Sequence, residues 1–153
     1  MFSYVPTFIP NSIYLIGAGG TGSRLIPMLA QLVRTCLRQF NPTGFAEVLS
    51  IYIIDGDKVE EKNLLRQNFI SKDVGKYKAS VLASRYSNAF GITITPCNQF
   101  IKNSAPLVFE GIQTIRHDFQ NSIVILALDS ADARREVLRY ILRANSRYER
   151  DVH

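Results

Sequence analysis

A short glycine-rich segment, Gly17-Ala18-Gly19-Gly20-Thr21-Gly22, is a candidate anion-binding turn. It follows a short apolar run and precedes a segment with helical spacing. Such a turn aims backbone N–H groups and the positive end of a helix dipole at its ligand. A phosphate group is the natural ligand. The alternative is a tight strand-to-helix turn, in which the glycines only allow positive φ angles and close packing.

Asp55 is a second candidate, because it directly follows the apolar run that ends at Ile54. Dinucleotide-binding folds carry an acid at this place, where it accepts hydrogen bonds from ribose hydroxyls. Asp55 lies 33 residues after Gly22, whereas the NAD fingerprint places its acid about 20 residues beyond the glycines. We attribute the longer interval to an insertion around residues 37 to 47. Alternatively, Asp55 is a turn residue paired with Gly56.

The rest of the sequence predicts the elements that would position these residues. Short β-branched runs alternate with helical stretches, which is typical of a parallel sheet built from βαβ units. The pattern predicts strands at residues 13–16, 48–54, 92–97 and 122–128, and helices from about Leu25 to Cys36, Ser71 to Phe90 and Ala131 to Tyr148. Pro27 is expected in about the first turn of its helix, and residues 99–120 are expected to be mostly loop. The predicted fold is α/β and Rossmann-like, with a mainly parallel sheet that we expect to be truncated after about four strands.

Composition limits the class of protein. The 153 residues are 46% hydrophobic and 20% charged, which is close to the average for globular domains and excludes a disordered or fibrous chain. No apolar run reaches the roughly 18 residues of a membrane-spanning helix, and two cysteines cannot form a metal cluster unaided. We expect residues 1–153 to form one cytoplasmic domain, incomplete at its C-terminus.

Five sequence blocks are more specific than any single residue. They are Gly17 to Gly22, Asp55-Gly56-Asp57, Asn63-Leu64-Leu65-Arg66-Gln67, Val74-Gly75-Lys76-Tyr77-Lys78 and Leu128-Asp129-Ser130. In this order and spacing they resemble the ThiF/MoeB/E1 superfamily, whose members adenylate the C-terminus of ubiquitin-like and sulfur-carrier proteins. The resemblance runs from about Ile13 to Arg135. Within the superfamily, the form Gly-Thr-Gly-Ser-Arg is similar to ThiF-like proteins of plasmid-associated PRTRC systems.

The resemblance implies a role for each matching residue. Gly17, Gly19, Gly20 and Gly22 would line the phosphates and adenosine of ATP, Asp55 would hold the ribose hydroxyls, Asn63, Arg66 and Lys78 would contact the phosphates, and Asp129 would bind Mg²⁺. Arg66, Lys78 and Asp129 are the implied catalytic set. Arg66, Lys78 and a Mg²⁺ ion held by Asp129 suit the chemistry, because a carboxylate attacking the α-phosphorus builds negative charge that fixed cations must neutralise.

Simpler interpretations stay open for the charged residues. Arg66 and Lys78 could be ordinary solvated side chains. Either Asp129 or Ser130 could cap the last helix, a role compatible with metal binding. Asp57 is expected to be structural.

Cys36 and Cys97 are expected to be small buried residues rather than thioester-forming nucleophiles. Arginines 135, 139, 143 and 147 recur every four residues, so they form one stripe on the last helix. We expect a solvated basic face there, with contact to an acidic protein surface or a nucleic-acid backbone as the alternative.

The leading hypothesis is therefore an ATP- and Mg²⁺-dependent adenylating enzyme that acts on a ubiquitin-like or sulfur-carrier protein. We expect a homodimer that binds neither membrane nor nucleic acid. The superfamily often supplies an arginine before the first strand, and none occurs here. A non-catalytic ATP-binding or scaffold fragment is accordingly the first alternative. An NAD-dependent oxidoreductase is the second, and the long interval between the glycines and Asp55 argues against it.

Overall fold

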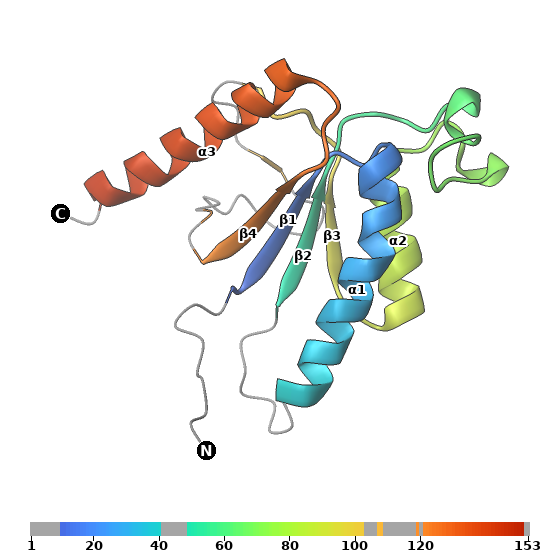
Figure 1. Cartoon of the computed structure of the whole chain (residues 1–153), viewed down its shortest axis with the longest axis horizontal. Coiled ribbons are helices and arrows are strands. Elements are labelled where there is room, and N and C mark those ends of the chain that lie inside the picture. The colour runs from blue at the N-terminus through green and yellow to red at the C-terminus, as the bar shows by residue number, and fades with distance from the viewer. Residues whose placement is uncertain (1–9, 41–48, 103–106, 109–118, 120, 152–153) are drawn as a thin grey trace.

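The sheet has four parallel strands in the order β3-β2-β1-β4. The structure is a computed structural model, and it describes residues 10–40, 49–102, 107–108, 119 and 121–151. The strands are β1 (Ser12–Ile16), β2 (Ser50–Ile54), β3 (Ile94–Cys97) and β4 (Ser122–Leu126), and the helices are α1 (Gly20–Phe40), α2 (Lys78–Phe90) and α3 (Ala131–Asp151). Helices flank the sheet (Figure 1). The predicted Rossmann-like fold is confirmed.

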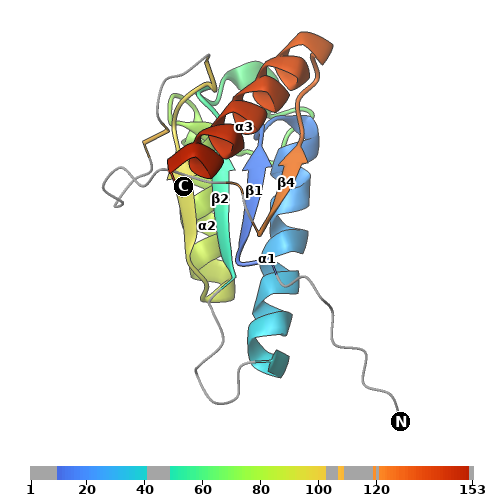
Figure 2. The ribbon, with the colours of Figure 1, turned by 90° about the vertical axis from the view of Figure 1, so that its left-hand side faces the viewer.

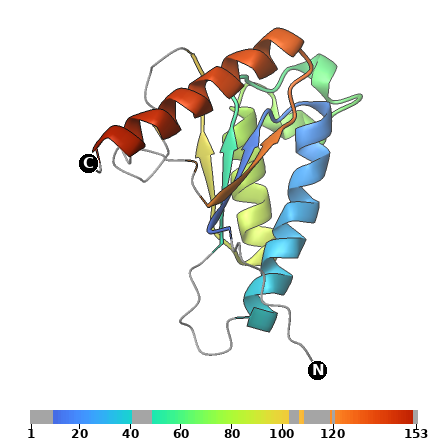
Figure 3. The ribbon, with the colours of Figure 1, turned by 60° about the vertical axis from the view of Figure 1, so that its left-hand side comes forward.

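Two apolar layers cover the two faces of the sheet. Figure 2 and Figure 3 show α1 and α2 on one face and α3 crossing the other. Because side chains alternate along a strand, Ile13 and Leu15 of β1 enter the core under α1 and α2. Tyr14 and Ile16 enter the second core, which includes Val137 of α3. Each fully buried aliphatic side chain contributes about 1.5–3 kcal/mol, so burial on both faces fixes the register of β1.

The helix predicted to begin at Ser71 begins instead at Lys78. Ser71–Asp73 forms a separate 3-10 turn, η2, and Gly75 has a φ of +83°, which interrupts helical geometry. The segment pairs with the loop after β2, because the Gly75 N–H donates to the Val59 carbonyl at 2.9 Å. This arrangement makes Lys78 the first residue of α2 and buries its side chain.

Pro27 does not lie in the first helical turn as expected. Because α1 begins at Gly20, Pro27 lies in the helix interior. Proline has no N–H, so it cannot donate to the carbonyl four residues earlier, which belongs to Ser23. That carbonyl instead accepts a hydrogen bond from Asn68 Nδ2 at 3.1 Å. A contact from a distant loop therefore replaces the hydrogen bond missing from the helix.

Other differences from the prediction are small. β3 begins at Ile94 rather than at residue 92, β4 ends at Leu126 rather than at Leu128, and α3 continues to Asp151. Residue 48 and most of the loop predicted at 99–120 lie outside the described residues. None of the helices in the described part of the chain is long and apolar enough to cross a membrane.

Candidate functional site

An open cavity of about 600 Å³ lies at the carboxyl ends of the strands, where Ile16 of β1 and Ile54 of β2 contribute to its wall. The strand order changes direction between β1 and β4, and open α/β sheets bind ligands at such switch points. Predicted site residues in the wall are Gly17, Gly19, Gly20, Asp55, Arg66, Lys78 and Asp129. Its volume suits a small-molecule ligand, since such sites measure roughly 300–1,000 Å³.

The four glycines divide into two pairs. Gly17 has a φ of +100°, and a Cβ there would lie 2.7 Å from the Ala127 carbonyl oxygen. A Cβ on Gly22 would lie 1.9 Å from the Gly17 carbonyl oxygen, so this pair is required by close packing. A Cβ on Gly19 would meet nothing within 4 Å, and one on Gly20 only the Arg66 carbonyl oxygen at 3.9 Å. Packing does not require glycine at Gly19 and Gly20, and both positions leave room for a ligand beside the N-terminus of α1.

Asp55 organises the turn that faces the cavity. Its Oδ2 accepts a hydrogen bond from the Ala18 N–H at 2.6 Å, and its Oδ1 accepts one from the Asp57 N–H at 2.7 Å. Burial raises the pKa of Asp55 above its usual value, and these two amides and the Lys78 ammonium partly offset that effect. Each carboxylate oxygen keeps a second lone pair. Asp55 can therefore hold the glycine turn and also accept a hydrogen bond from a hydroxyl group.

Lys78 places a buried positive charge in the cavity wall. Its side chain is only 7% exposed, and its Nζ lies 3.2 Å from Asp57 Oδ2. The Lys78 N–H also donates to the Asp57 carbonyl at 2.9 Å. Asp57 therefore holds the ammonium in place, and it also lines the cavity. A charge removed from water interacts more strongly with a nearby anion than a solvated charge does.

Arg66 and Gln67 face the cavity from the turn after η1 (Glu61–Asn63). Their N–H groups both donate to the Asn63 carbonyl, at 3.2 and 2.8 Å. No described residue pairs with the exposed Arg66 guanidinium, which leaves its donors available. The Gln67 Oε1 atom is buried and has no hydrogen-bond partner among the described residues. An unpaired buried acceptor is costly, so a ligand that donates a hydrogen bond would satisfy it.

Asp129 lies between β4 and α3 and has an exposed side chain in the cavity wall. The helix cap is supplied by Ser130, whose Oγ accepts a hydrogen bond from the Ala133 N–H at 3.3 Å. The sequence left the cap open between these two residues, and the structure assigns it to Ser130. The Asp129 carboxylate has no partner among the described residues, so it is free to bind a cation.

Two predicted site residues do not line the cavity. Gly22 lies behind the turn, as its contact with Gly17 requires. Asn63 is 3% exposed, and its Oδ1 accepts a hydrogen bond from the Glu60 N–H at 2.8 Å. Asn63 therefore shapes the turn that carries Arg66, and direct contact with phosphate stays a prediction.

Sequence reasoning missed one wall of the cavity. Gln99 and Phe100 follow β3 and line the cavity, as does Glu136 on α3. The Phe100 ring lies against Gly56, where a Cβ would come within 2.6 Å of the ring, yet Phe100 remains 54% exposed. The available signal was position, because residues that follow a parallel strand face the ligand edge of the sheet.

The cysteines and the arginine stripe lie outside this set. Cys97 is buried and Cys36 half-buried, and the described residues contain no cluster of three or more metal-ligating side chains. Arg135, Arg139 and Arg143 are exposed and line a second, polar cavity of about 380 Å³. The side chain of Arg147 is outside the described residues.

The fold and the site together define an open α/β domain with a candidate ligand site at the switch point of its sheet. The sequence matches the ThiF family over residues 10–148, and the chain belongs to that family. The predicted superfamily is therefore confirmed, whereas the PRTRC subtype stays a prediction. A comparison with curated proteins found no match.

Solved structures with a similar fold include two of the E. coli tRNA N6-threonylcarbamoyladenosine dehydratase TcdA and one of E. coli MccB. TcdA alone has a TM-score of 0.58 and 25% identity, over 86% of this chain and 47% of that chain. TcdA with ATP has a TM-score of 0.58 and 24% identity, over 86% and 46%. MccB with AMPCPP and MccA has a TM-score of 0.58 and 22% identity, over 88% and 34%. This chain thus spans less than half of each.

Proposed function

We propose that this chain binds ATP with Mg²⁺ and adenylates the C-terminal carboxylate of a ubiquitin-like or sulfur-carrier protein. The observation that carries the proposal is the convergence of Arg66, Lys78 and Asp129 on one cavity, beside a turn with free space at Gly19 and Gly20. Membership of the ThiF family supports it. The PRTRC subtype, the homodimer and the cytoplasmic location belong to the same proposal and rest on the sequence.

The residues present suit both ligands. The N-terminus of α1 faces the cavity and can receive a phosphate, while Asp55 and the unpaired Gln67 Oε1 can accept hydrogen bonds from the nucleoside. Mg²⁺ usually binds one or two carboxylates together with substrate phosphates, which the lone Asp129 carboxylate matches. When bound there, Mg²⁺ would neutralise part of the charge on the phosphate oxygens.

The proposed reaction asks for alignment and charge stabilisation rather than acid–base catalysis. A carboxylate oxygen of the partner bonds to the α-phosphorus, the bond from that phosphorus to pyrophosphate breaks, and an acyl-adenylate and pyrophosphate result. The carboxylate is already an anion at neutral pH, so no base is required. Lys78 is held in place by Asp57 and Arg66 has free donors, so both can neutralise charge on the phosphate oxygens.

A scaffold that binds ATP without turnover is the second candidate. The cavity supports it, because the residues that would hold ATP and Mg²⁺ do not by themselves require a protein partner. Membership of the ThiF family argues against the NAD-dependent oxidoreductase.

The test is Mg²⁺-dependent exchange of pyrophosphate into ATP. The probe is a ubiquitin-like protein ending in glycine, compared with the same protein blocked as a C-terminal carboxamide. Arg66→Ala and Asp129→Ala are expected to abolish exchange. Their controls are Arg34→Ala and Asp132→Ala, which change exposed residues of α1 and α3 that do not line the cavity.

Exchange that requires the free carboxylate and is lost in both site variants would support adenylation. ATP binding without exchange would favour the scaffold. Failure to bind ATP at all would contradict both.

A further inference from the structure

We propose that Asn68 is a positioning residue that docks the Arg66 turn onto the phosphate-binding start of α1. The inference rests on the proposed function, because it concerns the placement of Arg66 relative to bound phosphates. Asn68 is not among the residues predicted to contact ATP, and it does not line the cavity. Its role follows from the contacts described below.

Asn68 binds Ser23 through two separate hydrogen bonds. The Asn68 N–H donates to Ser23 Oγ at 3.0 Å, and Asn68 Nδ2 donates to the Ser23 carbonyl at 3.1 Å. Ser23 is fully buried in the first turn of α1. The Ser23 Oγ in turn donates to the Gly20 carbonyl at 3.4 Å. The Ser23 hydroxyl thus connects the Asn68 backbone to the turn that would hold phosphate, and the Asn68 side chain adds a second link to the Ser23 carbonyl.

Pro27 makes this docking site available. In an uninterrupted helix, the N–H of residue 27 would donate to the Ser23 carbonyl. Because proline lacks that N–H, the carbonyl depends on Asn68 for a donor. The proline and the asparagine therefore act as a pair, although they belong to different segments.

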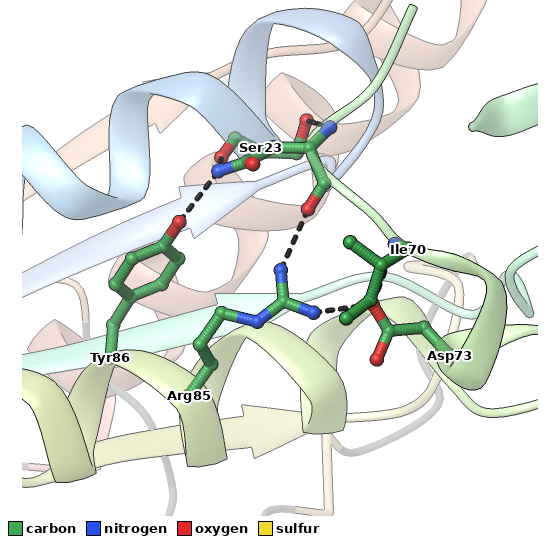
Figure 4. Close-up of polar contacts among 6 residues, drawn as sticks. Ser23, Ile70, Asp73, Arg85 and Tyr86 are labelled. Atoms are coloured by element: carbon green, nitrogen blue, oxygen red, sulfur yellow. Dashed lines mark hydrogen bonds and ion pairs between the residues drawn. The ribbon is translucent and has the colours of Figure 1, made fainter. Parts of the chain in front are cut away.

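Residues of α2 and η2 hold Asn68 in this orientation. Asn68 Nδ2 also donates to the Tyr86 hydroxyl at 2.5 Å, and Arg85 donates to the Asn68 carbonyl at 2.9 Å. Arg85 is paired with Asp73, whose carboxylate accepts the Ile70 N–H at 2.9 Å. Figure 4 shows Ser23, Tyr86 and Arg85 around this point, with Asp73 on the far side of Arg85. Residues of α1, α2 and η2 thus meet at Asn68.

The position of Arg66 follows from this anchor. Arg66 lies two residues before Asn68, and its carbonyl oxygen accepts a hydrogen bond from Arg24 of α1 at 3.5 Å. The same oxygen lies 3.9 Å from the place of a Cβ on Gly20. The backbone of the Arg66 turn therefore lies directly against the start of α1. The Asn68 side chain supplies one of the links between this turn and α1, so its removal would fix the separation of Arg66 from the glycine turn less tightly.

The experiment compares Asn68→Ala with the double variant Asn68→Ala/Pro27→Ala. Asn68→Ala leaves the Ser23 carbonyl without its donor, so its melting temperature is expected to fall. The alanine at position 27 supplies an N–H to that carbonyl from within the helix, so the double variant is expected to recover the melting temperature. Pro27→Ala alone provides the reference, and Ser87→Ala is a control that removes a side-chain acceptor of the Ile94 N–H near the start of β3.

A positioning role makes a distinct prediction for catalysis. The kcat of pyrophosphate exchange is expected to fall about tenfold in both Asn68 variants, with the KM for ATP changed by less than about threefold, because misplacing a group by about 1 Å affects mainly the transition state. Recovery of kcat together with the melting temperature in the double variant would overturn the proposal. A normal kcat in Asn68→Ala would do the same.

Failure of the proposed function would be recognised separately, since the unmodified protein would then show no exchange. In that case, the proposal is tested by amide hydrogen exchange of Asn63–Phe69 in the double variant, whose melting temperature is expected to match that of the unmodified protein. Faster exchange than in Pro27→Ala alone would support the anchor, and unchanged exchange would overturn it.

Discussion

Arg66 and Lys78 lie on one side of the cavity, in segments that pack with β1, β2, β3, α1 and α2. We call this the buried side. On the other side, Asp129 joins β4 to α3, which we call the exposed side. Four of the five residues in β1 are buried, whereas none of the residues in β4 is. On α3, Leu138 and Leu142 are 50% and 68% exposed.

The two sides therefore differ in how firmly their charged side chains are held before a ligand binds. On the buried side, the Lys78 ammonium is held by Asp57 and the backbone of the Arg66 turn is held by Asn68. Fixed charges of this kind need no reorganisation during a reaction. On the exposed side, the Asp129 carboxylate has no partner in the described part of the chain. In its proposed role, Asp129 would share a Mg²⁺ ion with phosphates and waters. Such a ligand can be less firmly held than a side chain that binds phosphate directly.

The largest effect is expected from disrupting the tightest contact of the buried side. Gly22→Ala would place a Cβ 1.9 Å from the Gly17 carbonyl oxygen, so the free energy of unfolding should fall by about 4 kcal/mol or more. Gly19→Ala is the matched control, since its Cβ meets nothing within 4 Å. Urea denaturation measures both, and equal stability of the two variants would contradict the packing argument.

The next effect concerns catalysis rather than folding. Lys78→Met replaces a buried ammonium with an apolar side chain of similar length, and is expected to lower kcat for pyrophosphate exchange about a hundredfold. Lys76→Met changes an exposed lysine on the same segment and should leave exchange unchanged. Activity retained in Lys78→Met would show that the buried charge does not act on the phosphates.

Asp129→Asn tests the exposed side. The substitution keeps the size of the side chain and removes its charge, so exchange should require a Mg²⁺ concentration about tenfold higher, in keeping with weaker coordination by a neutral amide. The free energy of unfolding should not change, because Ser130 supplies the helix cap. A titration with Mg²⁺ gives the first quantity. An unchanged Mg²⁺ requirement would exclude Asp129 as the metal ligand.

The smallest effect is expected from the cap of α3. Ser130→Ala removes the acceptor of the Ala133 N–H and should lower the free energy of unfolding by about 1 kcal/mol. Asp132→Ala, in the first turn of the same helix, leaves the cap intact and serves as the comparison. If only Asp132→Ala destabilises the protein, Ser130 is not the cap.

The parallel sheet and its ligand edge were predictable because local patterns determine them. Apolar runs predicted the strands, and residues directly after strands, such as Asp55 and Asp129, reach the carboxyl edge of the sheet. The start of α2 was missed because Ser71 resembles a helix cap, whereas Gly75 pairs with Val59, a contact set by tertiary structure.

The Asn68 contact was not predictable for a similar reason. It depends on a carbonyl that Pro27 leaves free, and nothing in the sequence near Asn68 indicates which turn will lie beside it. The position of Phe100 after β3 was an available signal, but the contact of its ring with Gly56 depends on tertiary packing. Sequence patterns thus predicted the residues beside strands and missed those placed by contacts between segments.

The central claim is that a carboxylate oxygen bonds to the α-phosphorus of ATP in this cavity. The most direct measurement uses a ubiquitin-like partner labelled with ¹⁸O in its C-terminal carboxylate, incubated with the protein, ATP and Mg²⁺, and then treated with hydroxylamine. Hydroxylamine attacks the acyl carbon, so the account predicts a partner hydroxamate and AMP that carries one ¹⁸O. Unlabelled AMP, or release of ADP and phosphate alone, would contradict it.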